Sequence, residues 1–210
     1  MGNRWMDIEQ LKGTETRVAR AMSIENVTLA ALDRDPFNER NIKMCQMYVS
    51  RFSDMMRRNC WLLLWGNVGT GKSYAATGIA NGVIQNGFSA EMLTFEDLLN
   101  HSREGDEELN AIGADLVIID DLAPIPASRF DLERIHTFLQ SRHREGKPMI
   151  FTSRLSPSDM RSAPDELGGK VFDFILTVCY PMQFTGKPRN VLRVNCPADC
   201  PAEIPQTFQT

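Results

Sequence analysis

Short runs of apolar residues alternate with longer segments along the chain. The runs cover residues 60–65 (CWLLLW), 90–95 (AEMLTF), 115–122 (DLVIIDDL) and 148–153 (PMIFTS), and an alternating segment covers 190–195 (NVLRVN). Continuous apolar runs of this length, bounded by turn residues, are typical of strands buried on both faces of a parallel sheet. Each of these segments is therefore predicted to be a strand.

The intervening segments show the helical period, with apolar residues recurring at three- and four-residue steps. Helices are predicted over 39–58, 72–86 and 128–146, and residues 156–180 are predicted to be mostly helical. Ser128 and Asp131 have the spacing of a helix-capping pair. The charged segment 101–109 is predicted to be a loop. Strands that alternate with helices predict an α/β layered domain with a mainly parallel sheet.

Gly78 and Gly82 lie inside the helix predicted over 72–86. Each costs about 1 kcal/mol relative to alanine in a helix. A close approach of this helix to the sheet would compensate for that cost.

The two ends of the chain give weaker signals. Residues 1–32 are predicted to be an N-terminal extension, in which Trp5, Ile8 and Leu11 have helical spacing. Such a helix would either cap the protein's own core, the interpretation we favour, or bind a partner. The turn DRDPFN marks the entry to a core over 33–195, and the proline-rich residues 196–210 are predicted to be an extended or disordered tail.

Composition places the chain among ordinary globular proteins. Its 210 residues fit one domain, and 42% hydrophobic and 24% charged residues are usual values. The net charge of −4 argues against a protein coated in basic charge for duplex binding. No apolar run reaches the roughly 18 residues that span a bilayer. The first residues lack a signal-peptide core, so we expect a cytoplasmic protein.

The cysteines predict neither a disulfide framework nor a metal site. The chain has five, an odd number, at irregular spacings. A site at Cys196 and Cys200 would need two more ligands, and the three histidines lie far away in sequence. Reduced structural thiols are the favoured interpretation.

Residues 66–73 read GNVGTGKS and match the phosphate-loop pattern G-x-x-x-x-G-K-[ST]. Glycines let successive backbone N–H groups point inward and bind an anion, and a helix that begins at Lys72 adds its positive N-terminal dipole. Lys72 is expected to reach the β- and γ-phosphates, and the Ser73 hydroxyl to bind Mg²⁺. The predicted nucleotide-binding residues are Gly66, Asn67, Val68, Gly69, Thr70, Gly71, Lys72, Ser73 and Tyr74.

Two further strand ends carry polar groups. LVIIDD delivers Asp120 and Asp121 to the end of a buried strand, where Asp120 would hold Mg²⁺ and Asp121 would orient or deprotonate a water. FTSR, at 151–154, offers Thr152, Ser153 and Arg154 as candidates for contact with the γ-phosphate or the water. Simple strand termination explains FTSR equally well.

The segments GNVGTGKS, IIDDLA, HREGKPMIFTSRLS and KVFDFILTVCYPMQFTGKPR together resemble the ATPase core of DnaC/IstB-type AAA+ proteins, from about Asp33 to Arg193. This group contains helicase loaders and helper ATPases of transposition. The resemblance implies a P-loop NTPase of the AAA+ (ASCE) class, a three-layer sandwich with a five-stranded sheet in the order 5-1-4-3-2. It also implies ATP and Mg²⁺ as cofactors, a replicative DNA helicase as partner, single-stranded DNA as a second candidate partner, and ATP-dependent self-assembly.

The chain departs from that group at three positions. Arg154 stands where relatives carry a sensor asparagine, Lys170 where they carry a trans-acting arginine, and Phe174 where an arginine commonly follows the aspartate. Lysine is a point charge and cannot bind phosphate oxygens with the two-pronged geometry of arginine. We therefore expect intact ATP binding and weak hydrolysis, with Lys72, Asp121, Arg154 and Lys170 as the catalytic residues.

Three alternatives stay open at this stage. They are a transposition helper of the same fold, a small-molecule kinase, and a nucleotide-locked interaction module without useful catalysis. The candidates for DNA contact are scattered, and each is more simply a solvated charge: Arg103, Arg129, Arg154, Arg161 and Lys187.

Overall fold

A parallel sheet of five strands forms the centre of the molecule, in the order β2-β3-β4-β1-β5. We analysed a computed structural model, which describes residues 27–32, 36–105, 109, 112–123, 128–162 and 166–186. The strands are β1 (Trp61–Trp65), β2 (Ala90–Thr94), β3 (Leu116–Leu122), β4 (Met149–Ser153) and β5 (Cys179–Gln183). Read from the other edge, the order is 5-1-4-3-2, so the predicted α/β fold class is confirmed.

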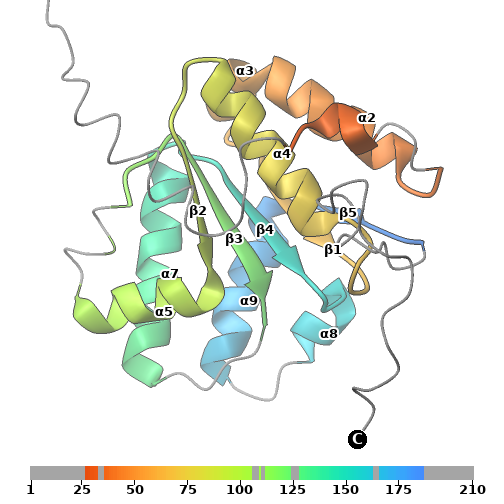
Figure 1. The fold of residues 1–210 in the computed structure, drawn as a ribbon. Helices are drawn as coiled ribbons and strands as arrows, with labels where there is room; N and C mark the ends of the chain where they lie inside the picture. The colour runs from red at the N-terminus through yellow and green to blue at the C-terminus, as the bar shows by residue number, and fades with distance from the viewer. Residues whose placement is uncertain are drawn as a thin grey trace, which may run out of the picture.

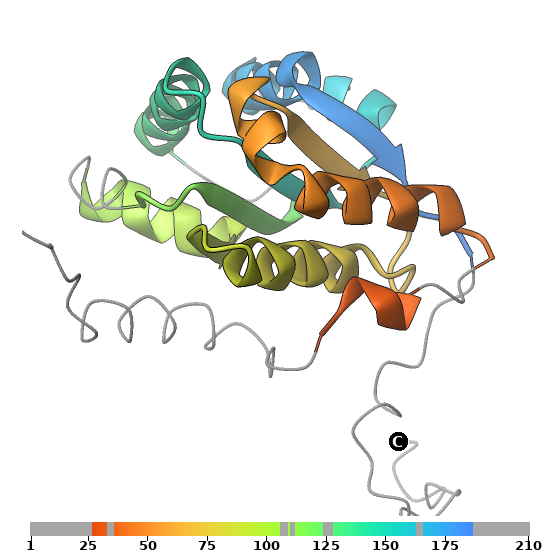
Figure 2. The ribbon, with the colours of Figure 1, turned by 90° about the horizontal axis from the view of Figure 1, so that it is seen from above.

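Helices cover both faces of the sheet and make three layers, as Figures 1 and 2 show from two directions. One face carries η1 (Leu29–Leu32), α2 (Glu39–Ser50), α3 (Phe52–Arg57) and α4 (Lys72–Gln85). The other carries α5 (Phe95–Glu104), α7 (Arg129–Arg144), α8 (Pro157–Arg161) and α9 (Glu166–Val178). Each face has its own hydrophobic core, because successive strand residues point to opposite sides.

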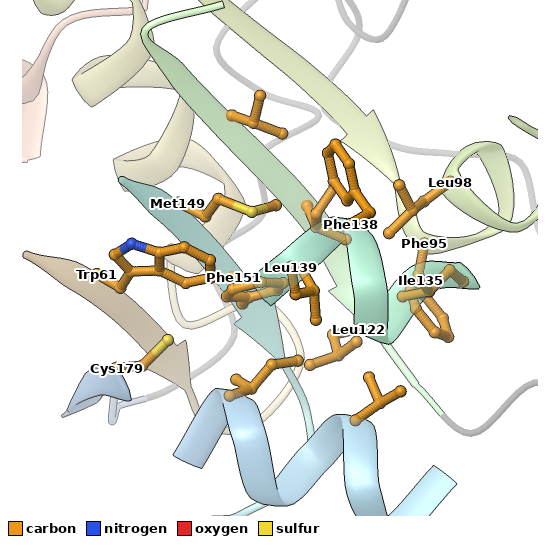
Figure 3. Close-up of a cluster of buried hydrophobic side chains, with 14 of the residues drawn as sticks. Trp61, Phe95, Leu98, Leu122, Ile135, Phe138, Leu139, Met149, Phe151 and Cys179 are labelled. Carbon is orange, nitrogen blue, oxygen red and sulfur yellow. The ribbon is translucent and has the colours of Figure 1, made fainter. Parts of the chain in front are cut away.

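The core beneath α5, α7 and α9 is the more aromatic of the two. Trp61 and Phe151, from neighbouring strands, lie against side chains of α7 such as Leu139 (Figure 3). On the opposite face, Ile79 and Val83 of α4 pack against Leu64 of β1. Together the two cores fix α4 and the strand ends at the edge where the sequence places its polar residues.

Gly78 and Gly82 do allow a close approach, but the partners are helices rather than the sheet. A Cβ built on Gly78 would lie 2.9 Å from the Leu29 side chain of η1, and one on Gly82 would lie 2.6 Å from Val49 of α2. The two glycines therefore let η1 and α2 lie directly on α4. Although α4 packs on the sheet through other residues, the prediction that Gly78 and Gly82 serve that contact is wrong.

Three predicted elements are wrong in part. The helix over 39–58 is two helices, because Arg51 leaves the helical conformation (φ −119°, ψ 31°) and Phe52 begins α3 with its ring buried. The loop over 101–109 is helical up to Glu104, since α5 begins at Phe95 behind a capping box of Thr94 and Asp97. The helical segment over 156–180 ends at Val178, because Cys179 and Tyr180 enter β5.

Pro181 lies within β5, where a proline is tolerated because the strand is at the edge of the sheet and pairs only with β1. Several sequence predictions lie outside the described residues: the helix at Trp5, Ile8 and Leu11, the strand over 190–195, the tail over 196–210, and Lys187. Of the predicted turn over 33–38, residues 36–38 are described and form a turn.

Within the described ranges, no helix is long and apolar enough to cross a membrane. The cysteines of this part of the chain, Cys45, Cys60 and Cys179, are free thiols. Burial raises the pKa of the Cys45 thiol to about 12, as expected for a structural cysteine.

Candidate functional site

The glycine-rich loop over 66–71 connects the end of β1 to the start of α4. Gly66, Gly69 and Gly71 have φ angles of +143°, +78° and +100°, which residues with side chains rarely adopt. The turn that they make ends at Gly71, directly before the first residue of α4. Backbone N–H groups of this loop and of the first turn of the helix could therefore bind an anion together.

Close packing fixes the start of the loop. The Gly66 amide donates to the Ser153 carbonyl of β4 across 3.1 Å, and a Cβ built on Gly66 would lie only 2.1 Å from the carbonyl oxygen of Phe184. The Phe184 amide in turn donates to the Trp65 carbonyl across 2.7 Å. A side chain at position 66 would therefore push β1 away from the chain that follows β5.

Lys72 is the buried cation of the site, with 7% of its surface exposed. Its ammonium donates to the Asn67 carbonyl across 2.7 Å, which closes the loop and leaves two further N–H donors. Burial lowers its pKa, while the nearby charges of Asp120 and Asp121 oppose that shift and Arg154 adds to it. The phosphate loop, the two acids and Arg154 are thus close enough to act on one another electrostatically.

The two aspartates occupy an irregular end of β3. Asp120 is half-buried and Asp121 is exposed, with a left-handed φ of +54° at Asp121. The register between β3 and β4 shifts between Ile119 and Leu122, as in a β-bulge. A bulge of this kind turns successive side chains in new directions, so both carboxylates can project from the same end of the strand.

Thr152 holds this irregular end in place from the neighbouring strand. Its buried hydroxyl donates to Oδ1 of Asp120 across 2.5 Å and accepts the Asp121 amide across 2.9 Å. Because β4 lies between β1 and β3, Thr152 sits between the phosphate loop and the two acids.

Arg154, the residue that directly follows β4, binds the second acid. Its Nε donates to Oδ1 of Asp121 across 3.1 Å, and its Nη2 donates to Oδ2 across 2.8 Å. This is the two-pronged geometry that guanidinium and carboxylate groups favour. The hydrogen bond and the charge of Asp121 raise the pKa of Arg154, so the guanidinium stays charged.

The residues of the site fit a nucleoside triphosphate with Mg²⁺. The glycine turns allow backbone N–H groups to face an anion, and the buried Lys72 offers a cation. The Ser73 hydroxyl, in the first turn of α4, and the Asp120 carboxylate are oxygen ligands of the kind that Mg²⁺ prefers. Among the described residues, no cluster of three or more His, Cys, Asp or Glu suggests a site for another metal.

Three of the predicted residues lie less close to this centre. Val68 is exposed at the tip of the loop, and the Tyr74 side chain packs against the core beneath α4. Lys170 is exposed on α9 and does not take part in the hydrogen bonds described for the loop or the acids. Its predicted catalytic role stays a prediction.

Sequence reasoning missed Asn38, which supports the loop from outside. This side chain is 2% exposed. Its amide donates to the Thr185 carbonyl across 2.8 Å and reaches the Thr70 carbonyl at 3.5 Å, and its oxygen accepts the Thr185 amide across 2.9 Å. Asn38 thereby links the start of α2, the phosphate loop and the end of β5. An asparagine closing a D-P-F-N turn was the only signal in the sequence.

Comparison with known proteins agrees with this fold. Solved structures with a similar fold include DnaI (24% identity, TM-score 0.67, covering 80% of this chain and 92% of that chain). They also include the DnaC helicase loader (19%, 0.65, 79% and 100%) and the replication initiator DnaA bound to AMPPCP and single-stranded DNA (15%, 0.63, 78% and 51%). A search of curated protein sequences gives no match.

The sequence itself matches the family described as IstB-like ATP binding protein over residues 9–179. This range contains the phosphate loop, both aspartates and all of β4. Because the match covers most of the chain, the protein belongs to the family of IstB-like ATP binding proteins.

Proposed function

We propose that the protein is an AAA+ ATPase of the cytoplasm that binds ATP with Mg²⁺, hydrolyses it slowly, and in its ATP-bound state loads or remodels a replicative DNA helicase. The proposal that the protein binds ATP is supported by one observation: the phosphate loop, Lys72 and the two acids lie together at one end of the sheet. In the proposed division, a core over 33–195 performs this work and is flanked by an extension (1–32) and a tail (196–210).

The roles of the residues follow from their positions. Backbone amides of Gly66–Ser73 and the Lys72 ammonium would hold the phosphates, and Ser73 and Asp120 would hold Mg²⁺. When bound, Mg²⁺ supplies positive charge that stabilises the phosphate oxygens during transfer. Asp121 would accept a proton from the attacking water. Slow hydrolysis fits a chain with lysine rather than arginine at position 170, since arginine fingers contribute about 10³ to 10⁵ in rate.

The helicase partner is supported by fold likeness to DnaI and to a structure described as the DnaC helicase loader. Contact with single-stranded DNA is supported in the same indirect way by the DnaA complex. A second candidate function, a helper ATPase of transposition, is supported by the family description itself. Both functions would use the same nucleotide site and differ in the protein that the ATP-bound state recognises.

One experiment tests first the binding of ATP and then the choice of protein partner. Calorimetry of the full chain with ATP and Mg²⁺ should show binding that Lys72→Ala removes, and absence of binding by the wild type would overturn the proposal. The chain loaded with AMPPCP is then mixed with a purified replicative DNA helicase, or with a purified transposase. Retention of the helicase, lost in Lys72→Ala, supports the loader. Retention of the transposase alone selects the transposition helper.

A further inference from the structure

We propose that Arg154 restrains hydrolysis by holding Asp121, so that an ion pair within the site slows turnover in addition to the effect of lysine at position 170. This inference rests on the proposed function, because it concerns the same ATP site. It assigns Arg154 the role of a positioning residue that acts through Asp121, and it predicts that removal of the guanidinium speeds the reaction.

The Arg154 guanidinium binds both carboxylate oxygens of Asp121. Arg154 Nε lies 3.1 Å from Oδ1 of Asp121, and Nη2 lies 2.8 Å from Oδ2. A carboxylate that accepts a proton from water must offer an oxygen in line with that water. With one N–H donor on each oxygen, the Asp121 carboxylate is oriented by Arg154 rather than by a substrate water.

Hydrogen bonds hold the backbone of Asp121 and the backbone beside Arg154 in fixed positions. The Asp121 amide donates to the buried Thr152 hydroxyl. Beside Arg154, the Ser153 hydroxyl donates to the Leu122 carbonyl across 2.6 Å and accepts the Leu155 amide across 3.1 Å. These bonds tie the end of β3 to the end of β4 on both sides of the ion pair. The backbones that carry the two partners are therefore already in place, and the remaining cost of the pair is the rotamer freedom that its two side chains lose.

The ion pair between Arg154 and Asp121 is exposed to solvent, so its two side chains can separate. The Arg154 and Asp121 side chains are 62% and 48% exposed, so solvent screens their attraction. Such a pair slows a reaction without abolishing it, because the open form is still populated. This fits a protein in which hydrolysis is slow rather than absent.

The step that Arg154 would slow is the hydrolysis of ATP, which needs water as its only other reactant. The water oxygen forms a bond to the terminal phosphorus, the bond from phosphorus to the bridging oxygen breaks, and ADP leaves with that oxygen. The proton of the water passes to the Asp121 carboxylate and later returns to solvent. While Arg154 binds both carboxylate oxygens, two of the roughly four lone-pair sites of Asp121 are occupied, and the ion pair fixes the direction of the others. The carboxylate then accepts the proton only from a water that lies in that direction.

The alternative role for Arg154 is direct stabilisation of the phosphate charge in the transition state, and it predicts the opposite result. Arginine is well suited to phosphate oxygens, and its charge is felt at Lys72. Replacement of Arg154 would then slow hydrolysis, as loss of an arginine finger does. The sign of the change in rate separates the two roles.

The test compares Mg²⁺-ATP hydrolysis of the full chain with that of Arg154→Asn, Arg154→Gln, Asp121→Asn and the double variant Asp121→Asn/Arg154→Asn. Arg144→Asn, which removes an exposed arginine of α7, is the matched control for loss of charge. We expect Arg154→Asn and Arg154→Gln to raise kcat about tenfold, a part of what a freed general base supplies. Arg144→Asn should leave kcat unchanged, and the double variant should be as slow as Asp121→Asn.

The inference is overturned if Arg154→Asn and Arg154→Gln hydrolyse ATP at the wild-type rate or more slowly while they bind ATP normally. It is also overturned if the double variant is faster than Asp121→Asn, because Arg154 would then act through another group. Failure of the wild type to bind ATP in calorimetry is a different result, and it overturns the proposed function together with this inference. Thermal unfolding of each variant confirms that the compared proteins are folded.

Discussion

Thr152 donates its hydroxyl hydrogen to Asp120 across the boundary between β4 and β3, at a distance of 2.5 Å. The same hydroxyl oxygen accepts the amide of the next residue along β3, so one buried group fixes both the side chain of the first acid and the backbone of the second. Thr152 is 1% exposed, so its hydroxyl makes these bonds away from bulk water. The position of the Asp120 carboxylate, the proposed Mg²⁺ ligand, is therefore fixed by Thr152 of β4, a strand that provides none of the proposed ligands.

Thr152→Val tests this relationship, because valine keeps the shape of threonine and removes the hydroxyl. We expect the Mg²⁺-dependent part of ATP affinity to fall by about 10- to 100-fold, as when a partner of a metal ligand is removed. Stability should fall by about 1–3 kcal/mol, because the Asp121 amide loses its acceptor. Calorimetry with and without Mg²⁺ measures the first effect, and urea unfolding the second.

Thr152→Ser is the control, since it restores the hydroxyl, and it should recover most of the lost affinity. Equal Mg²⁺-ATP affinity in the valine variant and the wild type would contradict the role that we assign to this hydroxyl.

Gly66→Ala tests the close approach at the start of the phosphate loop. The added methyl would lie 2.1 Å from the Phe184 carbonyl oxygen, which is backbone and cannot rotate away. We expect a loss of stability of about 3 kcal/mol or more, in the range of severe packing defects, and a lower melting temperature. Gly87→Ala is the matched control. Gly87 also has a positive φ, but nothing lies within 4 Å of its Cβ position, so the cost should stay near 1 kcal/mol. Similar losses in the two variants would show that backbone strain, rather than Phe184, requires glycine at position 66.

Much of the fold could be predicted from the pattern of apolar residues, since buried parallel strands are the most distinctive segments in such a sequence. Four strand positions were located in this way, and the phosphate loop was located by its glycines and Lys72. The fifth strand was missed because CYPMQ is short, contains Pro181 and follows α9 without a turn signal. Its position depends on pairing with β1, a tertiary interaction that no local pattern encodes.

The contacts around the site were also beyond sequence reasoning. Thr152 and Arg154 were predicted as candidates for contact with the γ-phosphate or the water, and Arg154 as a catalytic residue. Their contacts with the two acids were not predicted, because the bulge in β3 is not visible in LVIIDD. The helix α5 was missed although TFED carries the capping signal of Thr94 and Asp97, since the charged residues after it favour a loop. Side-chain partners between strands depend on register, and a shift of one residue changes all of them.

Arg142→Met tests the end of the sheet away from the phosphate loop. The buried Arg142 guanidinium, 3% exposed, donates to the carbonyls of Ile112, Ala114 and Pro148, which lead into β3 and β4. Burial lowers its pKa to about 10, so the group is still charged at neutral pH. Methionine leaves the carbonyls without these donors, and we expect a loss of about 3 kcal/mol in urea unfolding. Arg144→Met, two residues along α7 and exposed, should change stability by less than about 0.5 kcal/mol. Equal small effects would mean that water satisfies the three carbonyls.

Asp131 makes the stability of α7 sensitive to acid. The Ser128 hydroxyl donates to Oδ2 of Asp131 across 2.7 Å, and Arg103 lies 3.7 Å away. The bond from the Ser128 hydroxyl is the main cause of a pKa below the ordinary aspartate value, with smaller contributions from the Ser128 amide and Arg103. A carboxyl whose pKa is lower in the folded state stabilises that state above the unfolded pKa of about 3.9. This stabilisation is lost as the pH falls through the folded value.

Asp131→Asn should therefore be less stable than the wild type at pH 7 by about 1 kcal/mol, the usual value of a helix cap. The difference should shrink as the pH is lowered from about 5 toward 3, because the wild type then becomes protonated at the same position. Urea unfolding at a series of pH values measures both curves. Glu133→Gln removes an exposed carboxylate from the same helix, and its difference from the wild type should stay small throughout, as for other exposed pairs. A difference at Asp131 that does not change with pH would show that the shape of the cap, rather than its charge, stabilises α7.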